Sequence, residues 1–297
     1  MTTGDRRTLA ELIARYKLEP SLRDVYVEGP RDVQMVRWWS SENGLFAAAV
    51  YEIDTVAIPL DLLQRLGFSQ NRRGCVLAVG YALEQALGAE AKQPTCVVDS
   101  DFDFLLEAEG LRSQSTGLAL VLRTDYSSME MYLFRAECIA KYLGLVCGID
   151  VHDVDAFLAA LTRILTWLFC VRAANETLAL GMAPVAVEKS LERTGGALRL
   201  DPNNYLRRYL TSNGRASIRN AFAREVDRHA AAAVGDPRRF MHGHDFLSVL
   251  GWYVRKCARK FRSAASEVVE TGVWGCCESR HLACEELFVL LKARIAG

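Results

Sequence analysis

This chain has little of what would place it in a specialised class of protein. Its nine cysteines are odd in number and follow no regular spacing, which excludes a disulfide framework and favours reduced thiols. The most apolar stretch, residues 156–171, is interrupted by Arg163, so no membrane span is predicted. The charged opening MTTGDRRTLAELIARYK has no apolar core, so no secretory signal is expected. Together these absences predict a cytoplasmic protein that does not enter a membrane.

Two further absences narrow the class of function. The formal net charge is zero, so the chain as a whole is neither a polycation nor a polyanion. No segment has the form G-x-x-x-x-G-K-S/T, so any ATP hydrolysis coupled to this chain must come from another subunit.

The composition is that of an ordinary globular protein, with 51% hydrophobic and 24% charged residues in 297, which excludes a wholly disordered chain. The charge is unevenly distributed. Residues 85–155 hold 5 Lys and Arg against 12 Asp and Glu, whereas residues 199–262 hold 14 against 5. An acidic centre beside a basic region suggests metal ions near a polyanion, and two solvated faces explain it equally well.

The hydrophobic pattern predicts strands that alternate with helices in the first half of the chain. Such alternation is typical of an α/β unit with a largely parallel sheet. The expected strands are 23–27, 47–58, 95–98 and 118–124, and the expected helices are 5–17, 32–43 and 74–88.

Helical periodicity dominates after residue 130, where strand signals nearly vanish. The sequence therefore predicts an α/β catalytic domain over residues 1–148 and a helical domain over 149–297. The expected helices are 130–146, 153–181, 203–232, 244–262 and 280–295.

Acidic residues follow three of the predicted strands. Glu28 follows Val-Tyr-Val, Asp99 and Asp101 follow Cys-Val-Val, and Glu130 follows the fourth strand after a short turn. Since carboxyl ends of parallel strands meet at one edge of a sheet, these groups are expected to converge. Clustered carboxylates repel one another unless a cation relieves them, and oxygen ligands favour Mg²⁺ or Mn²⁺.

The order of these motifs resembles that of Toprim (topoisomerase–primase) domains. The run Val27-Glu28-Gly29-Pro30-Arg31-Asp32 resembles their V-E-G-x-x-D start, and residues 97–103 resemble their D-x-D motif. Residues 124–133 resemble the D-x(4)-E-N-Y-L segment of one subgroup, with Met131 where that subgroup has Asn. Residues 241–247 resemble its G-H/K-D-L element. The subgroup includes the effector nuclease of PARIS-type phage defence, and it is distantly related to the OLD (overcoming lysogenization defect) nucleases.

This resemblance implies a fold, an activity and partners. The fold is a Toprim-like, mostly parallel sheet flanked by helices and followed by a helical domain. The activity is a Mg²⁺-dependent (or Mn²⁺-dependent) endonuclease with Glu28, Asp99, Asp101 and Glu130 as catalytic groups. All four and Asp32 are metal ligands, in a site for two ions. The implied role is a toxic effector of antiphage defence that cleaves tRNA or another nucleic acid. It is restrained by an ABC- or AAA-type ATPase partner and dimerises when active.

A basic segment is the candidate nucleic-acid surface. Predicted helical spacing places Arg255, Arg259 and Arg262 on one face, with Lys256 beside them and aromatic residues near, a pattern that suits a phosphate backbone. A solvated helix or a subunit contact explains the same pattern.

Two other groups keep open interpretations. His242 and His244 precede Asp245, which is expected to cap the helix over 246–262; the histidines are either catalytic or part of a structural loop over the site. The cluster Cys276, Cys277, His281 and Cys284 lacks zinc-ligand spacing, which favours packing over metal binding.

Two other functions remain compatible with the motifs. A D-x-D after an apolar strand also occurs in metal-dependent nucleotide-sugar transferases, although that interpretation leaves Glu28 and Glu130 without roles. A non-catalytic Toprim-like scaffold that binds a partner protein through its helices is the other alternative.

Overall fold

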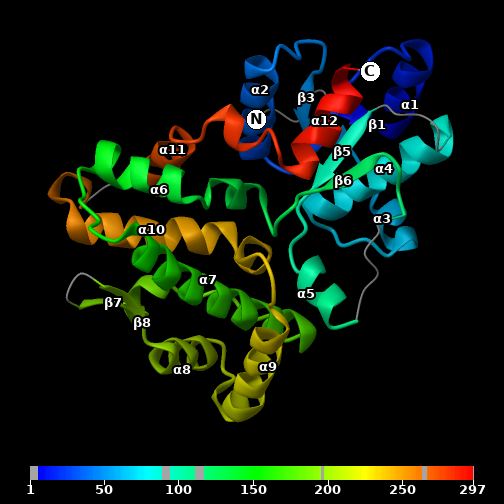
Figure 1. Cartoon of the computed structure of the whole chain (residues 1–297). Coiled ribbons are helices and arrows are strands. Elements are labelled where there is room, and N and C mark those ends of the chain that lie inside the picture. Colours follow the sequence, from blue (N-terminus) through cyan, green and yellow to red (C-terminus); the bar gives the residue numbers. More distant parts are fainter. Residues whose placement is uncertain (1–5, 89–93, 111–116, 195–196, 263–265, 297) are drawn as a thin grey trace. The chain divides into compact units, whose positions relative to one another are not determined.

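The computed structural model describes residues 6–88, 94–110, 117–194, 197–262 and 266–296 (Figure 1). The chain forms two compact units, each built from separated segments of sequence. The sheet unit comprises residues 1–100, 113–125 and 278–297, and the helical unit comprises residues 101–112 and 126–277.

A four-stranded parallel sheet forms the centre of the sheet unit, with strand order β3-β2-β5-β6. Val25 pairs with Val50 on one side and with Thr95 on the other, while Cys96 pairs with Val121. All four strands therefore end at the same edge, which confirms the predicted α/β class with a parallel sheet. The strands are β2 (Val25–Val27), β3 (Val50–Glu52), β5 (Thr95–Val98) and β6 (Val121–Arg123).

Helices surround this sheet, and the predicted helices near residues 5–17, 32–43 and 74–88 are confirmed. Thr8 caps the first helix through a capping box with Glu11, and Pro30 occupies the first turn of the second, where its missing N–H costs nothing. The unit contains α1 (Leu9–Leu18), α2 (Pro30–Glu42), α3 (Leu60–Leu66), α4 (Arg72–Leu87) and α12 (Glu286–Ala296). A two-stranded parallel pair, β1 (Arg7–Thr8) with β4 (Val56–Ala57), lies beside the 3-10 turn Ile53–Thr55.

The sheet unit has its core between the sheet and α1 and α4. Alternate strand residues, Tyr26 of β2 and Cys96 and Val98 of β5, pack into one cluster with Leu12, Val79 and Leu83. Gly80 allows the closest approach, because a Cβ at this position would lie 2.5 Å from Cγ2 of Val121. On α2, Trp39 is buried and packs against Phe288 of α12, with ring centroids 5.0 Å apart.

The helical unit is built mainly from helices and one small antiparallel hairpin. Its elements are α5 (Asp103–Ala108), α6 (Ala136–Lys141), a π-helical turn (Tyr142–Cys147), α7 (Val154–Thr177), β7 (Leu191–Thr194), β8 (Ala197–Leu200), α8 (Pro202–Ser212), α9 (Arg219–Ala232), α10 (Gly243–Cys257) and α11 (Ser266–Trp274). A 3-10 turn, Met129–Leu133, precedes α6.

Several predicted bounds in this unit are wrong. The helix expected over 203–232 is two helices, because Gly214 takes a left-handed conformation with φ +65° after α8 ends. The helix expected over 280–295 begins only at Glu286. The hairpin β7–β8 and helix α11 were not predicted, since their short apolar patterns are weak.

Helix α7 is the one described helix long and apolar enough to cross a membrane by length and composition. Half of its most apolar window is buried within the protein, and its inner face includes Leu161, Leu165 and Leu168. This burial is typical of a core helix, and Arg163 interrupts the apolar run as the sequence indicates.

The compact units differ from the two predicted domains of residues 1–148 and 149–297. Helix α12 belongs to the sheet unit, although it comes last in the sequence. Residues 126–148 belong to the helical unit, and the division falls inside the D-x-D run, between Ser100 and Asp101.

Replacing Gly80 with Ala tests the close contact of α4 with the sheet. Helix propensity alone would stabilise the variant by about 1 kcal/mol. We expect instead a loss of about 1–3 kcal/mol in the free energy of unfolding, because the new methyl group collides with Val121. Urea denaturation measures this, with Gly144→Ala as a control in open space. A more stable Gly80→Ala protein would contradict the packing.

Candidate active site

The edge where the parallel strands end carries the first part of the site. Glu28 directly follows β2 and Asp99 directly follows β5, two strands that are paired neighbours. Oε1 of Glu28 accepts a hydrogen bond of 2.8 Å from the backbone N–H of Asp99. Both side chains are partly exposed. The structure therefore places these two predicted ligands together, with the Glu28 side chain fixed across the strand ends.

The neighbouring strand end is fixed by a buried serine. The N–H of Ser100 donates to Oγ1 of Thr124 at 3.0 Å, and its hydroxyl donates to the carbonyl of Thr124 at 2.6 Å. Both residues are buried. These two bonds tie the end of β5 to the end of β6 and hold the chain where it leaves Asp99.

Asp32 has a structural role in the present arrangement. Its Oδ2 accepts a hydrogen bond of 2.9 Å from the N–H of Gly29, the residue before α2, which is the half of a capping box that a glycine N-cap allows. A carboxylate in the first turn also suits the positive end of the helix dipole. Asp32 thus lies one helical turn beyond Glu28, where a bound metal would compete with the cap.

Sequence reasoning missed an acidic pair and its cation at the same edge. Glu52 ends β3, and Asp54 follows it; both form ion pairs with Nη2 of Arg72, at 2.8 and 2.6 Å. The hydrogen bond with Asp54, followed by the charges of Asp54, Glu52 and Asp32, raises the pKa of Arg72. The broad strand predicted over 47–58 hid the strand end that would have identified Glu52.

Asp101, the second acid of the D-x-D run, begins the helical unit in a strained backbone conformation. Its φ is +46°, one of two positive values outside glycine among the described residues. Its N–H donates to the carbonyl of Ser127 at 2.8 Å, and the Ser127 hydroxyl donates to the carbonyl of Met241. Aspartate tolerates this conformation better than most residues, and such strain clusters at functional sites.

Glu130 lies against the start of helix α10. A Cβ added to Gly243 would collide with the Glu130 carboxylate and lie 2.8 Å from Oγ of Ser128. Only glycine fits here, and the helix begins with its free N–H groups beside an acid. The run around 241–247 thus contacts the segment that carries Glu130.

The two histidines of this element differ in environment. Burial is the main cause that lowers the pKa of His242 to about 4; Arg172 and His244 lower it further, while Asp245 and Glu130 oppose the shift. The Nδ1 atom of His242 has no hydrogen-bond partner among the described residues. His242 is therefore neutral at physiological pH, whereas His244 is exposed.

Asp245 does not cap the helix, so that prediction is wrong. Helix α10 begins at Gly243, which places Asp245 inside the first turn. Its two carboxylate oxygens accept hydrogen bonds of 2.6 and 2.7 Å from Nε and Nη2 of Arg172 on α7. This bidentate pair, largely buried, joins α10 to α7 and supports the histidine segment.

The predicted acids thus form two local groups. In the sheet unit, Glu28, Asp32 and Asp99 lie at one sheet edge. In the helical unit, Ser127 accepts from Asp101 and closely precedes Glu130. That the two groups share metal ions stays a prediction.

The predicted nucleic-acid face is not one continuous helical face. Helix α10 ends at Cys257, where Ala258 is extended, and a 3-10 turn contains Arg259. Lys256, Arg259 and Arg262 are exposed, while Arg255 lies 4.0 Å from Glu188. Nucleic-acid binding by these four residues stays a prediction, without the helical spacing that suggested it.

The cysteines of the last cluster differ in exposure. Cys276 and Cys277 are buried in the helical unit, whereas Cys284 is exposed. Burial raises the pKa of the Cys276 thiol, which keeps it protonated.

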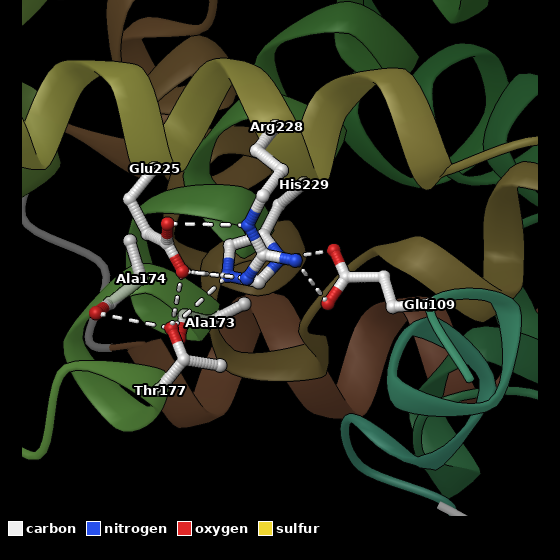
Figure 2. A network of polar contacts seen from close by, with 7 residues as sticks. All are labelled: Glu109, Ala173, Ala174, Thr177, Glu225, Arg228 and His229. Atoms are coloured by element: carbon white, nitrogen blue, oxygen red, sulfur yellow. Dashed lines mark hydrogen bonds and ion pairs between the residues drawn. The ribbon is translucent and has the colours of Figure 1, made fainter. Parts of the chain in front are cut away.

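A second polar cluster, which the sequence did not indicate, lies inside the helical unit (Figure 2). His229 is fully buried; its Nδ1 lies 2.6 Å from Glu109, and its Nε2 lies 3.2 Å from the Thr177 hydroxyl. Arg228 bridges Glu109 and Glu225 at 2.9 and 2.6 Å. The acid, imidazole and hydroxyl follow the order of a catalytic triad, but a fully buried imidazole offers no access to a substrate. The cluster therefore joins α7, α9 and the residue after α5.

The buried cluster predicts unequal effects of two neighbouring substitutions. His229→Ala leaves Glu109 buried without the imidazole, and we expect a loss of about 3 kcal/mol in the free energy of unfolding. Arg228 is 44% exposed, so Arg228→Ala should cost below about 1 kcal/mol. Urea denaturation of both variants measures the difference, and equal losses would contradict it.

The pKa of His242 predicts a pH dependence of stability. Folding lowers the pKa from 6.5 to about 4, so the unfolded chain binds a proton first as the pH falls. The contribution to stability is present above pH 6.5 and is lost as the pH falls toward 4. In urea denaturation between pH 7 and 4, His242→Gln should lose less stability than the parent. The control His244→Gln should follow the parent, and identical slopes for all three proteins would refute the prediction.

Comparison with known proteins assigns no family. No protein-family model and no curated protein matches this chain.

Proposed function

We propose that this chain is a Mg²⁺-dependent Toprim-like nuclease that cleaves phosphodiester bonds in tRNA or another nucleic acid. It acts as an effector of prokaryotic antiphage defence in the cytoplasm. A partner ATPase holds it inactive, and it dimerises when released. The regulatory part and the tRNA substrate rest on the resemblance to PARIS-type effectors.

One observation supports the catalytic part above the others. Glu28 and Asp99 follow paired parallel strands, and a 2.8 Å hydrogen bond from the backbone of Asp99 orients the Glu28 carboxylate. The Glu28 carboxylate is thus held across the strand ends beside the first acid of the D-x-D motif, and the resemblance assigns it the role of metal ligand or general base. The αL conformation of Asp101 turns the chain sharply at the same motif.

The chemistry of these donors suits hard divalent cations. Carboxylate oxygens are the ligands that Mg²⁺ and Mn²⁺ prefer, and Mg²⁺ keeps several waters in such sites. Asp99 and Asp101 would hold a first ion, and Asp32 and Glu130 are assigned to a second. Such ions would supply charge stabilisation for the in-line displacement of a phosphodiester. Asp32 would leave its cap on Gly29 to bind metal, so the second position is the weaker one.

The proposal predicts loss of cleavage from a substitution that preserves the fold. In Glu28→Gln the amide oxygen still accepts the Asp99 N–H, but the charge that holds a cation is lost. We expect cleavage of total tRNA or plasmid DNA with Mg²⁺ or Mn²⁺ to fall at least about 100-fold. Glu42→Gln, which changes an exposed carboxylate at the end of α2, should cleave like the parent.

Calorimetric titration with Mn²⁺ makes the test independent of the partner. If the parent binds Mn²⁺ and the variants Glu28→Gln and Asp99→Asn do not, the chain has a metal centre. This conclusion holds even if cleavage requires release from the ATPase. A parent that neither binds Mn²⁺ nor cleaves is a scaffold, which contradicts the proposal. Selective thermal stabilisation by nucleotide sugars would instead favour a transferase.

A further inference from the structure

A hollow lined by arginines lies in the helical unit. None of its lining residues belongs to the proposed metal site. It has a volume of about 540 Å³ and lies between the start of α7, the hairpin β7–β8 and Tyr253 of α10. Three arginines line it, Arg163 from α7, Arg193 from β7 and Arg199 from β8. This volume falls within the range of small-ligand sites.

A second hollow, with apolar walls, adjoins the first. The second has a volume of about 450 Å³, and it shares Arg163, Leu198 and Arg199 with the first. Trp167 lies in its wall, with Ile164 and Pro202. The ring of Trp167 meets Tyr205 edge-on at 5.7 Å and remains partly exposed. The two adjoining hollows together offer cationic groups and an aromatic wall.

The helical periodicity of α7 places the residues that line this surface on one side of the helix. Ala156, Ala160, Arg163 and Trp167 recur at helical spacing, and all four line one of the two hollows. The two alanines leave space below the hairpin, so the longer arginine and tryptophan side chains border a concavity rather than fill it.

Two of the three arginines are available to an anion. Among the described residues, Arg163 and Arg199 form no hydrogen bond or ion pair, although Glu192 stands opposite Arg199 in the hairpin register. Arg193 lies beside the hydroxyl of Tyr253. The lining also holds two acids: Asp153 caps α7 through the Ala156 N–H, and the exposed Asp150 lies 3.6 Å from His152. Three guanidinium groups against these two carboxylates leave the first hollow with a net positive charge.

We infer that this double hollow, the arginine hollow, binds a nucleotide unit, with its phosphate at Arg163 and Arg199 and its base against Trp167. Planar guanidinium groups match phosphate oxygens, and an aromatic face next to them accepts any base by stacking. An acidic peptide would use the arginines but leave the Trp167 wall without a flat partner. The unit belongs to a single strand or to a free nucleotide, and the inference does not depend on the proposed nuclease.

Binding is measured on the full chain carrying Glu28→Gln, in EDTA, so that neither cleavage nor a bound metal contributes. The probes are a short fluorescein-labelled single-stranded RNA, by fluorescence anisotropy, and AMP and ATP, by thermal shift. We expect Arg163→Gln and Arg199→Gln each to weaken binding about tenfold. For the RNA, each should reduce the salt slope by about 0.7, the value for one lost contact with a single strand.

Trp167 gives a second readout, which differs from that of the arginines in its salt dependence. Trp167→Leu should weaken binding about tenfold with an unchanged salt slope, and Trp167→Phe should restore most of it, because stacking involves no counterion. Circular dichroism confirms that these variants fold, since Trp167 also contacts Tyr205. Arg224→Gln, an exposed arginine of α9 outside both hollows, controls for the change in net charge.

The possible outcomes distinguish a nucleic-acid strand from a free nucleotide, and both of these from an acidic protein partner. Arginine-dependent binding of RNA alone identifies a strand, and arginine-dependent stabilisation by AMP or ATP identifies a free nucleotide. No binding of either probe overturns the inference, as does equal binding by Arg163→Gln, Arg199→Gln and Arg224→Gln. Displacement of the RNA by poly-glutamate at equal charge would assign the hollow to an acidic protein partner instead. Each result stands whether or not the chain cleaves nucleic acid.

Discussion

The hydrogen bond from the Asp99 backbone to Glu28 is the interaction on which the candidate site depends. It requires that β2 and β5 be adjacent, parallel and in register, so that one strand end reaches the other. The two bonds between Ser100 and Thr124 extend the same constraint to β6. Moving any of these strands by one residue would turn the acids to the other face of the sheet.

Much of the sheet side of this arrangement was readable from sequence. The apolar run Thr95–Val98 before Asp99 predicts β5 with its observed bounds, and Pro30 after Glu28 predicts the start of α2. These signals are local, because a strand end or a first helical turn is determined by a few neighbouring residues. Glu52 was missed because β3 is short and its pattern merges with the 3-10 turn that follows.

The helical side was less predictable, since its main contacts join residues distant in sequence. The pair Arg172 with Asp245 and the contact of Gly243 with Glu130 depend on tertiary packing that no local pattern records. Helix α10 ends at Cys257 although the residues that follow favour a helix, so tertiary context overrides propensity there. The buried His229 cluster has no sequence signature, because its acids come from separate elements.

The order of the segments bears on when the sheet unit can form during synthesis. Trp39 is made early, yet the aromatic ring that covers it, Phe288, is made after the whole helical unit. Most of the chain therefore leaves the ribosome before α12, the helix that packs against α2, has been translated. Contacts between residues so far apart in sequence form slowly. The carboxylates at the strand ends belong to a unit that is complete only when residues 278–297 have been translated.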